Sequence, residues 1–133
     1  MISGVKGRFY ATPYISADNK GSSEMTREFI MTTVYDKLWD RLGLTDEDLG
    51  ELQSVLLKNP ASGDIIQGTG GARKIRFALL NIGKSGGIRV IYIDLAHKAH
   101  THLLLSYPKS KQDDLTEDQK KQLKQAIKIL KGE

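Results

Sequence analysis

The stretch RKIRFALL, residues 73–80, decides the fold class because its apolar residues alternate with others. Alternation with a period of two is typical of a β-strand that has one buried face. The pattern places Ile75, Phe77 and Leu79 on that face, and Lys74 and Arg76 on the opposite one. We therefore expect a strand with two cations on its outer face.

Two more strand patterns follow this stretch along the chain. GIRVIYIDL (residues 87–95) and HTHLLLSY (residues 100–107) are rich in β-branched and aromatic residues, which favour strands. A glycine-rich hairpin loop, residues 81–87, connects the first pair, and LAHKAH forms a shorter turn between the second pair. The sequence therefore predicts three neighbouring antiparallel strands.

Helical spacing appears on both sides of these strands. TTVYDKLWDRLG predicts a helix that ends at Gly43, with Trp39 in the core and one face formed by Val34, Leu38 and Leu42. Thr45 is the expected N-cap of a second helix, whose buried stripe is Leu49, Leu52 and Leu56. Thr116 and Gln119 form a capping box before a last helix, whose stripe is Leu123, Ala126, Ile127 and Leu130.

The order of elements defines the expected fold class. REFIMTTV adds a short strand ahead of the first helix, so the order is strand, two helices, three antiparallel strands and a helix. This order predicts an α+β domain in which helices pack on one face of a small, curved antiparallel sheet. Residues 1–24 show no sustained period, and we expect an extension outside the core, with the domain covering residues 25–133.

Composition limits the classes of function. The chain has 133 residues, enough for one domain, a net charge of +4 and no cysteine, which excludes disulfide scaffolds and thiolate metal sites. It has no apolar run near the ~20 residues that span a bilayer and no apolar signal segment, so a cytoplasmic location is expected. Residues 73–111 carry eight cations and one acid, Asp94, whereas residues 24–64 are acidic. The basic half, residues 73–111, should therefore attract a polyanion.

The glycine loop GTGG, residues 68–71, does not match a nucleotide-binding motif. A dinucleotide fingerprint needs a third glycine where this chain has Arg73, and it needs a helix where a strand is expected. NIGKSGG lacks the leading glycine of a P-loop, since Ala78 occupies that position, and Gly86 and Gly87 disfavour the required helix. No nucleotide cofactor is therefore expected.

Other catalytic patterns are also missing from the sequence. His97, His100 and His102 have only Asp94 nearby, so we interpret them as half-buried strand histidines and not as metal ligands. The alternative is an imidazole that positions RNA or carries a proton. No G-x-S-x-G motif is present. The acids of residues 46–48 are explained by their place in the first turn of a helix.

The remaining pattern is a set of cations on the three strands. Lys74 and Arg76 project together, Arg89 begins the paired strand, and Tyr107 and Lys109 lie at the end of the last one. Neighbouring strands are ~5 Å apart, so these residues are expected on one concave surface. Clustered cations repel one another, which makes anion binding a better explanation than packing.

At these residues the chain resembles the RelE/HigB-like toxins of bacterial type II toxin–antitoxin systems, most closely the HigB branch. The shared motifs are NP, GD, IIQGTGGARKIR, GKSGGIRVIY, LLLSYPK and DLTEDQ, in the same order and with the same spacing, over about residues 26–131. The resemblance implies a microbial-RNase-like RelE/ParE toxin fold. It also implies a ribosome-dependent mRNA endonuclease (an mRNA interferase), which needs no metal and is inactivated by a cognate antitoxin.

The resemblance also implies roles for individual residues. The family cleaves mRNA in the ribosomal A site by attack of a ribose 2′-hydroxyl on the adjacent phosphate. Lys74 is the candidate base, with a pKa lowered by Arg73 and Arg76, and Lys109 is a clamp or acid. The two lysines can exchange roles. Arg76 and Arg89 are expected to clamp the phosphate. Contacts to RNA or ribosome are expected from Arg73, Lys84, Gly70, Gly71 and Tyr107, which can stack on a splayed base.

The chain departs from the family at three positions. Pro108 stands where the family usually has glycine, Ser110 where the RelE branch has an arginine, and Thr116 where that branch has a tyrosine. Lys109 or His102 is then left to supply the acid. Two alternative functions stay open: a ParE-type toxin that poisons DNA gyrase without nuclease activity, and a non-catalytic RNA-binding module.

Overall fold

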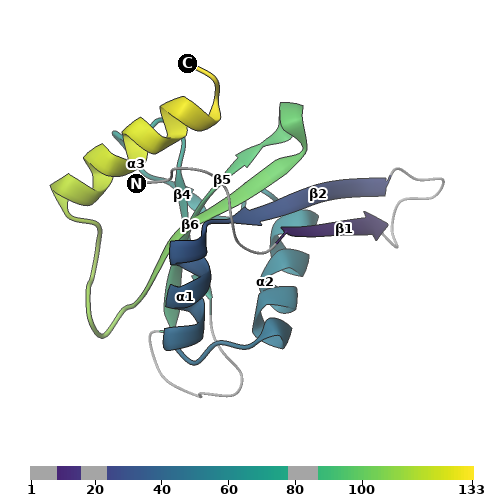
Figure 1. Ribbon diagram of the computed structural model, residues 1–133, viewed down its shortest axis with the longest axis horizontal. Helices are drawn as coiled ribbons and strands as arrows, with labels where there is room; N and C mark the ends of the chain where they lie inside the picture. Colours follow the sequence, from purple (N-terminus) through teal and green to yellow (C-terminus); the bar gives the residue numbers. More distant parts are fainter. Residues whose placement is uncertain (1–8, 16–23, 78–86) are drawn as a thin grey trace.

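The computed structural model describes residues 9–15, 24–77 and 87–133, with side chains from Arg27 onward. A six-stranded sheet has the order β1-β2-β6-β5-β4-β3 (Figure 1). Its strands are β1 (Phe9–Ile15), β2 (Glu24–Met31), β3 (Asp64–Ile65), β4 (Arg73–Phe77), β5 (Ile88–Leu95) and β6 (His100–Pro108). The helices are α1 (Thr33–Arg41), α2 (Asp46–Lys58), a 3-10 turn (Ala96–Lys98) and α3 (Glu117–Leu130). The expected α+β class is confirmed.

The sheet differs from the expectation in two respects. Neighbouring strands are antiparallel except β2 and β6, which are parallel, so the sheet is mixed. A parallel pair requires a long crossover, and here α1, α2 and β3–β5 lie between the two strands in the chain. The sequence patterns also did not predict the two edge strands, β1, which pairs with β2, and the two-residue β3, which pairs with β4. The boundary of the domain at residue 25 stays a prediction.

Helix starts agree closely with the sequence patterns. Thr45 accepts a hydrogen bond from the Asp48 backbone N–H (3.1 Å), and the Asp48 carboxylate accepts one from the Thr45 N–H (2.9 Å). Thr116 and Gln119 form the same reciprocal capping box at α3. These bonds satisfy backbone donors that have no partner within a helix, which is why the caps fix where each helix begins.

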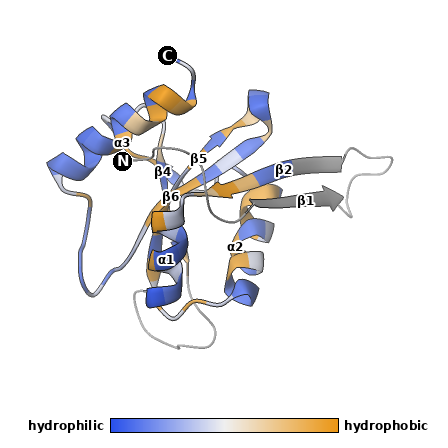
Figure 2. Cartoon of the chain, viewed as in Figure 1, coloured by the Kyte–Doolittle hydropathy of each residue, from blue (hydrophilic) through white to orange (hydrophobic). Residues whose placement is uncertain are grey.

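Helix α1 has a different buried face from the one expected. Tyr35 and Trp39 are buried, whereas Val34 is 70% exposed and Leu38 and Leu42 are half-buried. The two aromatic side chains bury more area than the aliphatic ones, so they set the rotation of this short helix. The stripe expected for α2, Leu49, Leu52 and Leu56, is confirmed. Figure 2 shows hydrophobic and hydrophilic residues around both helices.

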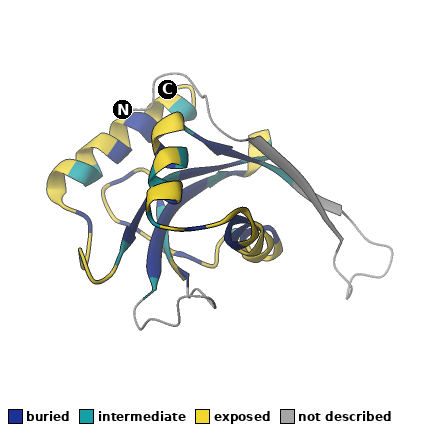
Figure 3. Ribbon diagram, turned by 60° about the horizontal axis from the view of Figure 1, so that its bottom comes forward, coloured by how far each residue is buried: buried dark blue, intermediate teal, exposed yellow. Residues whose placement is uncertain are grey.

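The helices cover both faces of the sheet, which corrects the expectation that they share one. One apolar cluster joins α1 and α2 to Val90, Tyr92 and Leu103. A second cluster joins Leu123 and Ile127 of α3 to the other face, through residues that include Ile91, Ile93 and Tyr107. The central strands are therefore buried between helices that expose their outer sides (Figure 3). Within the described residues, no helix has the length and apolar character needed to cross a membrane.

Candidate functional site

A row of three side chains crosses the sheet on the face that α3 partly covers. Arg76 of β4 pairs with Arg89 of β5, which pairs with Tyr107 of β6. Directly opposite residues project to the same face, with Cβ atoms ~5 Å apart. Lys74 lies two positions before Arg76 on β4 and therefore projects to this face as well. We call Lys74, Arg76, Arg89 and Tyr107 the basic row.

Burial within the basic row increases from β4 across β5 to β6. Arg76 on β4 is exposed, and the Lys74 side chain is 29% exposed. Arg89, on the middle strand of the three, is only 8% exposed. A guanidinium fixed at this depth loses few conformations when it binds an anion, and surrounding protein strengthens its field. The centre of the row is thus the strongest place for a phosphate.

An acidic residue that the sequence analysis did not assign lies against the row. Asp114, in the segment before α3, contacts Lys74 with Oδ1 3.4 Å from Nζ. The same oxygen accepts a hydrogen bond from the Leu115 backbone N–H at 2.8 Å. This backbone bond lowers the pKa of Asp114, and Lys74 and Lys120 lower it further. The only signal in the sequence was the pair of acids, Asp113 and Asp114, ahead of the capping box.

Tyr107 belongs to the apolar core beneath α3. It is 5% exposed and packs in the cluster that contains Leu115 and Leu123. Burial raises the pKa of its phenol, Asp114 raises it further, and Arg89 opposes them. This burial favours a core role over stacking on a splayed base, and the stacking stays a prediction. The packing of Tyr107 supports the role of a core residue at the end of β6.

Arg73 lies on the opposite face of the sheet from the basic row. Its strand partner is Tyr92, and its guanidinium Nη1 donates to the carbonyl oxygens of Gly63 (2.7 Å) and Ala61 (3.4 Å). Arg73 therefore holds the turn before β3 and does not crowd Lys74. This corrects the expectation that Arg73 tunes the Lys74 amine. The contact of Arg73 with RNA stays a prediction, and such a contact would lie on the face opposite the basic row.

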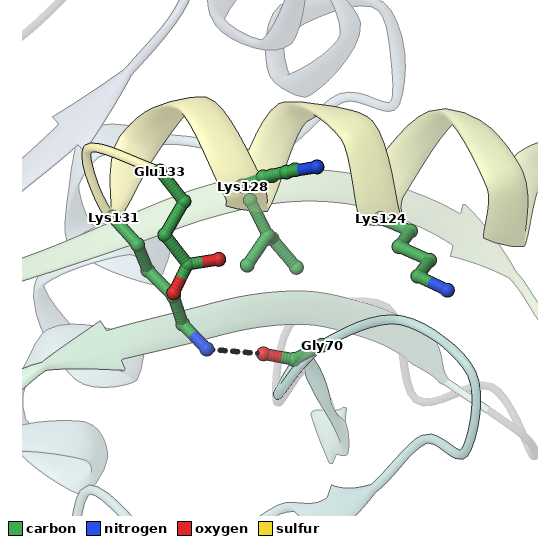
Figure 4. Close-up of a pocket in the computed structure, with 6 residues that line it drawn as sticks. Gly70, Lys124, Lys128, Lys131 and Glu133 are labelled. Carbon is green, nitrogen blue, oxygen red and sulfur yellow. Dashed lines mark hydrogen bonds between the residues drawn. The ribbon is translucent and has the colours of Figure 1, made fainter.

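The glycine loop lies under the last turn of α3. The Gly70 carbonyl accepts a hydrogen bond from Lys131 Nζ at 2.7 Å, and the loop helps to form a pocket of about 190 Å³ (Figure 4). The pocket is lined by Gly70, Lys124, Ile127, Lys128, Lys131 and Glu133. At Gly71, φ is 122° and an added Cβ would lie 3.5 Å from Ile93 Cδ1. The added Cβ would make only an ordinary contact, so glycine is needed here for its backbone conformation.

The loop lies apart from Arg76 of the basic row. Gly71 precedes Arg76 by five residues, or ~17 Å of extended strand. The expected RNA contacts of Gly70 and Gly71 therefore stay predictions that concern the α3 end of the molecule. Lys109 is exposed two residues beyond Tyr107, and its backbone N–H donates to the Gly87 carbonyl at 3.3 Å. Lys84 lies outside the described residues.

The histidines do not join the basic row. His102 on β6 is five residues from Tyr107, again ~17 Å along the strand, so it is not placed to act as the acid at the row. His102 is buried, whereas His97 is exposed and His100 contacts Glu28 at 3.3 Å. Asp94 instead accepts hydrogen bonds from Arg27 and Thr101. Among the described residues, no three His, Asp or Glu side chains gather as a metal site would require.

Burial of His102 predicts a loss of stability in mild acid. Its pKa is lowered from 6.5 to about 4, first by burial and then by His100 and Lys98. Between pH 6.5 and pH 4 the His102 imidazole is protonated in the unfolded chain but largely neutral in the folded one. The stability that His102 contributes is therefore complete above pH 6.5 and falls as the pH decreases toward 4. The loss should reach about 2 kcal/mol at pH 5.

Urea unfolding at pH 8 and pH 5 measures this loss. His102→Leu removes the titrating group and should flatten the pH dependence, whereas the exposed-site control His97→Gln should keep it. An unchanged pH dependence in His102→Leu would assign the acid sensitivity to other groups.

No protein-family model matches this chain.

Proposed function

We propose that this protein is the toxin of a toxin–antitoxin pair and acts as a ribosome-dependent mRNA endonuclease. The observation that carries the proposal is the cross-strand row in which Arg89, 8% exposed, lies between Arg76 and Tyr107 with Lys74 on the same face. Cations collected on a rigid sheet are suited to a phosphate whose charge grows during a reaction. The sequence motifs that resemble the HigB branch support the same reaction class.

The proposed reaction is cleavage by the RNA's own 2′-hydroxyl. The 2′-oxygen attacks the adjacent phosphorus, its proton passes to a base, and the bond from phosphorus to the 5′-oxygen breaks as that oxygen receives a proton. The products are a 2′,3′-cyclic phosphate and a 5′-hydroxyl. Arg76 and Arg89 hold the non-bridging oxygens. Lys74 and Lys109 are the candidates for base and acid, in either order.

The charge distribution of the row suits the transition state better than the substrate. The pentacovalent phosphorane carries more negative charge than the phosphodiester it comes from. Preorganised donors aimed at that charge contribute ~3–4 kcal/mol each to catalysis. Arg89 lies on the middle strand of the three and is 8% exposed, and such burial should limit the reorganisation needed during the reaction.

The expected activity is cleavage of ribosome-bound mRNA with little cleavage of free RNA. The two candidates for base and acid, Lys74 and Lys109, come from separate segments of the chain, so productive geometry should depend on the ribosome, and we expect at least ~100-fold faster cleavage there. Primer extension on mRNA after a pulse of expression, and on translating ribosomes in vitro, measures this. EDTA should act only through its effect on the ribosome.

Two outcomes would contradict the proposal. Efficient turnover on free RNA would remove the ribosome from the mechanism. Intact mRNA together with a DNA damage response would favour the gyrase-poisoning alternative. The ribosome and an antitoxin encoded with the toxin are the partners that this proposal requires.

A further inference from the structure

The hydroxyl of Tyr107 is a buried polar group without a partner among the described residues. Its Oη has almost no exposed area, and no hydrogen bond to it is present in that part of the chain. Buried hydroxyl groups in folded proteins are nearly always hydrogen-bonded, and an exception calls for a specific explanation. A site that is completed by a bound molecule is one such explanation.

The surroundings of this hydroxyl identify the kind of molecule. Arg89 is the direct cross-strand neighbour of Tyr107, and both Arg89 and Asp114 act on the phenol electrostatically. Burial keeps the phenol protonated, so it can donate a hydrogen bond. The Tyr107 hydroxyl can donate a hydrogen bond next to the Arg89 guanidinium, which lies at the centre of the basic row. This pair of groups is complementary to an oxyanion.

Asp114 already places a carboxylate at this surface. Its Oδ1 is 3.4 Å from Lys74 Nζ, longer than the 2.7–2.9 Å usual for a charge-assisted hydrogen bond. The Asp114 side chain is 62% exposed and is held mainly by its bond to the Leu115 N–H. An exposed, loosely paired carboxylate can be replaced by another anion at little cost.

We propose that Asp114 occupies the place of the substrate phosphate in the free protein, and that Tyr107 is a catalytic residue that donates a hydrogen bond to that phosphate. When phosphate enters, the Asp114 carboxylate leaves Lys74, and the Tyr107 hydroxyl binds one phosphate oxygen beside Arg89. The inference rests on the proposed function for the identity of the row. It assigns Tyr107 as a hydrogen-bond donor and Asp114 as a competing anion, two roles that the sequence patterns did not predict.

Titration with inorganic phosphate at low ionic strength tests the site without ribosomes. Tyr107→Phe removes only the hydroxyl, so phosphate should bind ~5–10-fold more weakly while the melting temperature is unchanged or higher. Asp114→Asn removes the competing charge and keeps an amide oxygen for the Leu115 N–H, so phosphate should bind ~3–10-fold more tightly. Asp113→Asn, an exposed neighbour with the same change in charge, is the matched control and should change binding by less than ~2-fold.

Single-turnover cleavage on saturated ribosomes is the second measurement. Tyr107→Phe should slow it by ~10–100-fold with unchanged ribosome affinity. If the wild type fails to cut ribosome-bound mRNA but the phosphate affinities shift as expected, the proposed function fails and the phosphate site stands. If the wild type cuts and both variants bind phosphate as it does, this inference fails. A lower melting temperature in Tyr107→Phe would show that the hydroxyl has a structural partner, and would also overturn it.

Discussion

Replacing Arg89 by alanine should abolish toxicity and slow single-turnover cleavage on saturated ribosomes by ~100-fold or more. Arg89 is 8% exposed at the centre of the basic row, between Arg76 and Tyr107. Its planar guanidinium can bind two phosphate oxygens at once, and this contact strengthens as charge develops. Ribosome affinity should change little, because many other phosphate contacts share that binding.

The measurement combines cleavage with a binding titration at two salt concentrations. Arg89→Lys keeps the charge without the two-pronged geometry, so its rate should fall between those of wild type and alanine. Lys37→Ala, on the exposed surface of α1, is a control for loss of one positive charge elsewhere. Circular dichroism shows whether each variant folds. Cleavage by a folded Arg89→Ala protein within a few-fold of wild type would place the active site elsewhere.

Replacing Trp39 by alanine should produce the largest loss of stability, ~3–5 kcal/mol. Trp39 has no exposed surface, and its indole Nε1 donates to the Thr45 carbonyl at 3.0 Å. The ring lies 6.1 Å from the ring of Tyr35, between centroids. Truncation leaves a cavity and removes a hydrogen bond that joins α1 to the cap of α2. Domains of this size have only about 5–15 kcal/mol of stability, so the substitution should remove a large part of it.

Urea unfolding followed by circular dichroism measures this loss. Trp39→Phe keeps most of the volume and should lose less. Val34→Ala changes a side chain that is 70% exposed on the same helix, so its effect should stay within ~0.5 kcal/mol. Equal losses in Val34→Ala and Trp39→Ala would mean that α1 packs with the other face inward.

Local patterns predicted the elements well because their causes are local. The capping bonds at Thr45 and Thr116 connect residues three apart, and alternation in β4 acts between adjacent residues. In the expected stripe of α3, Leu123, Ala126 and Ile127 are buried and Leu130 is half-buried, since helical spacing alone selects this face. In α1 the prediction followed the aliphatic spacing of Val34, Leu38 and Leu42. The buried aromatic pair, Tyr35 and Trp39, is offset from it by one residue and has more area to bury.

The sequence by itself determined the α+β class, the positions of the main strands and helices, and the sharing of one strand face by Lys74 and Arg76. Only the tertiary structure decided that β2 runs parallel to β6, that α3 covers the opposite face from α1 and α2, and that Arg89 lies between Arg76 and Tyr107. It also decided that Asp114, forty positions from Lys74, would meet it. Periodicity fixes which way a side chain points relative to its neighbours in the chain. Register and layer order depend on pairing between distant segments, and these are set by the burial of the whole core.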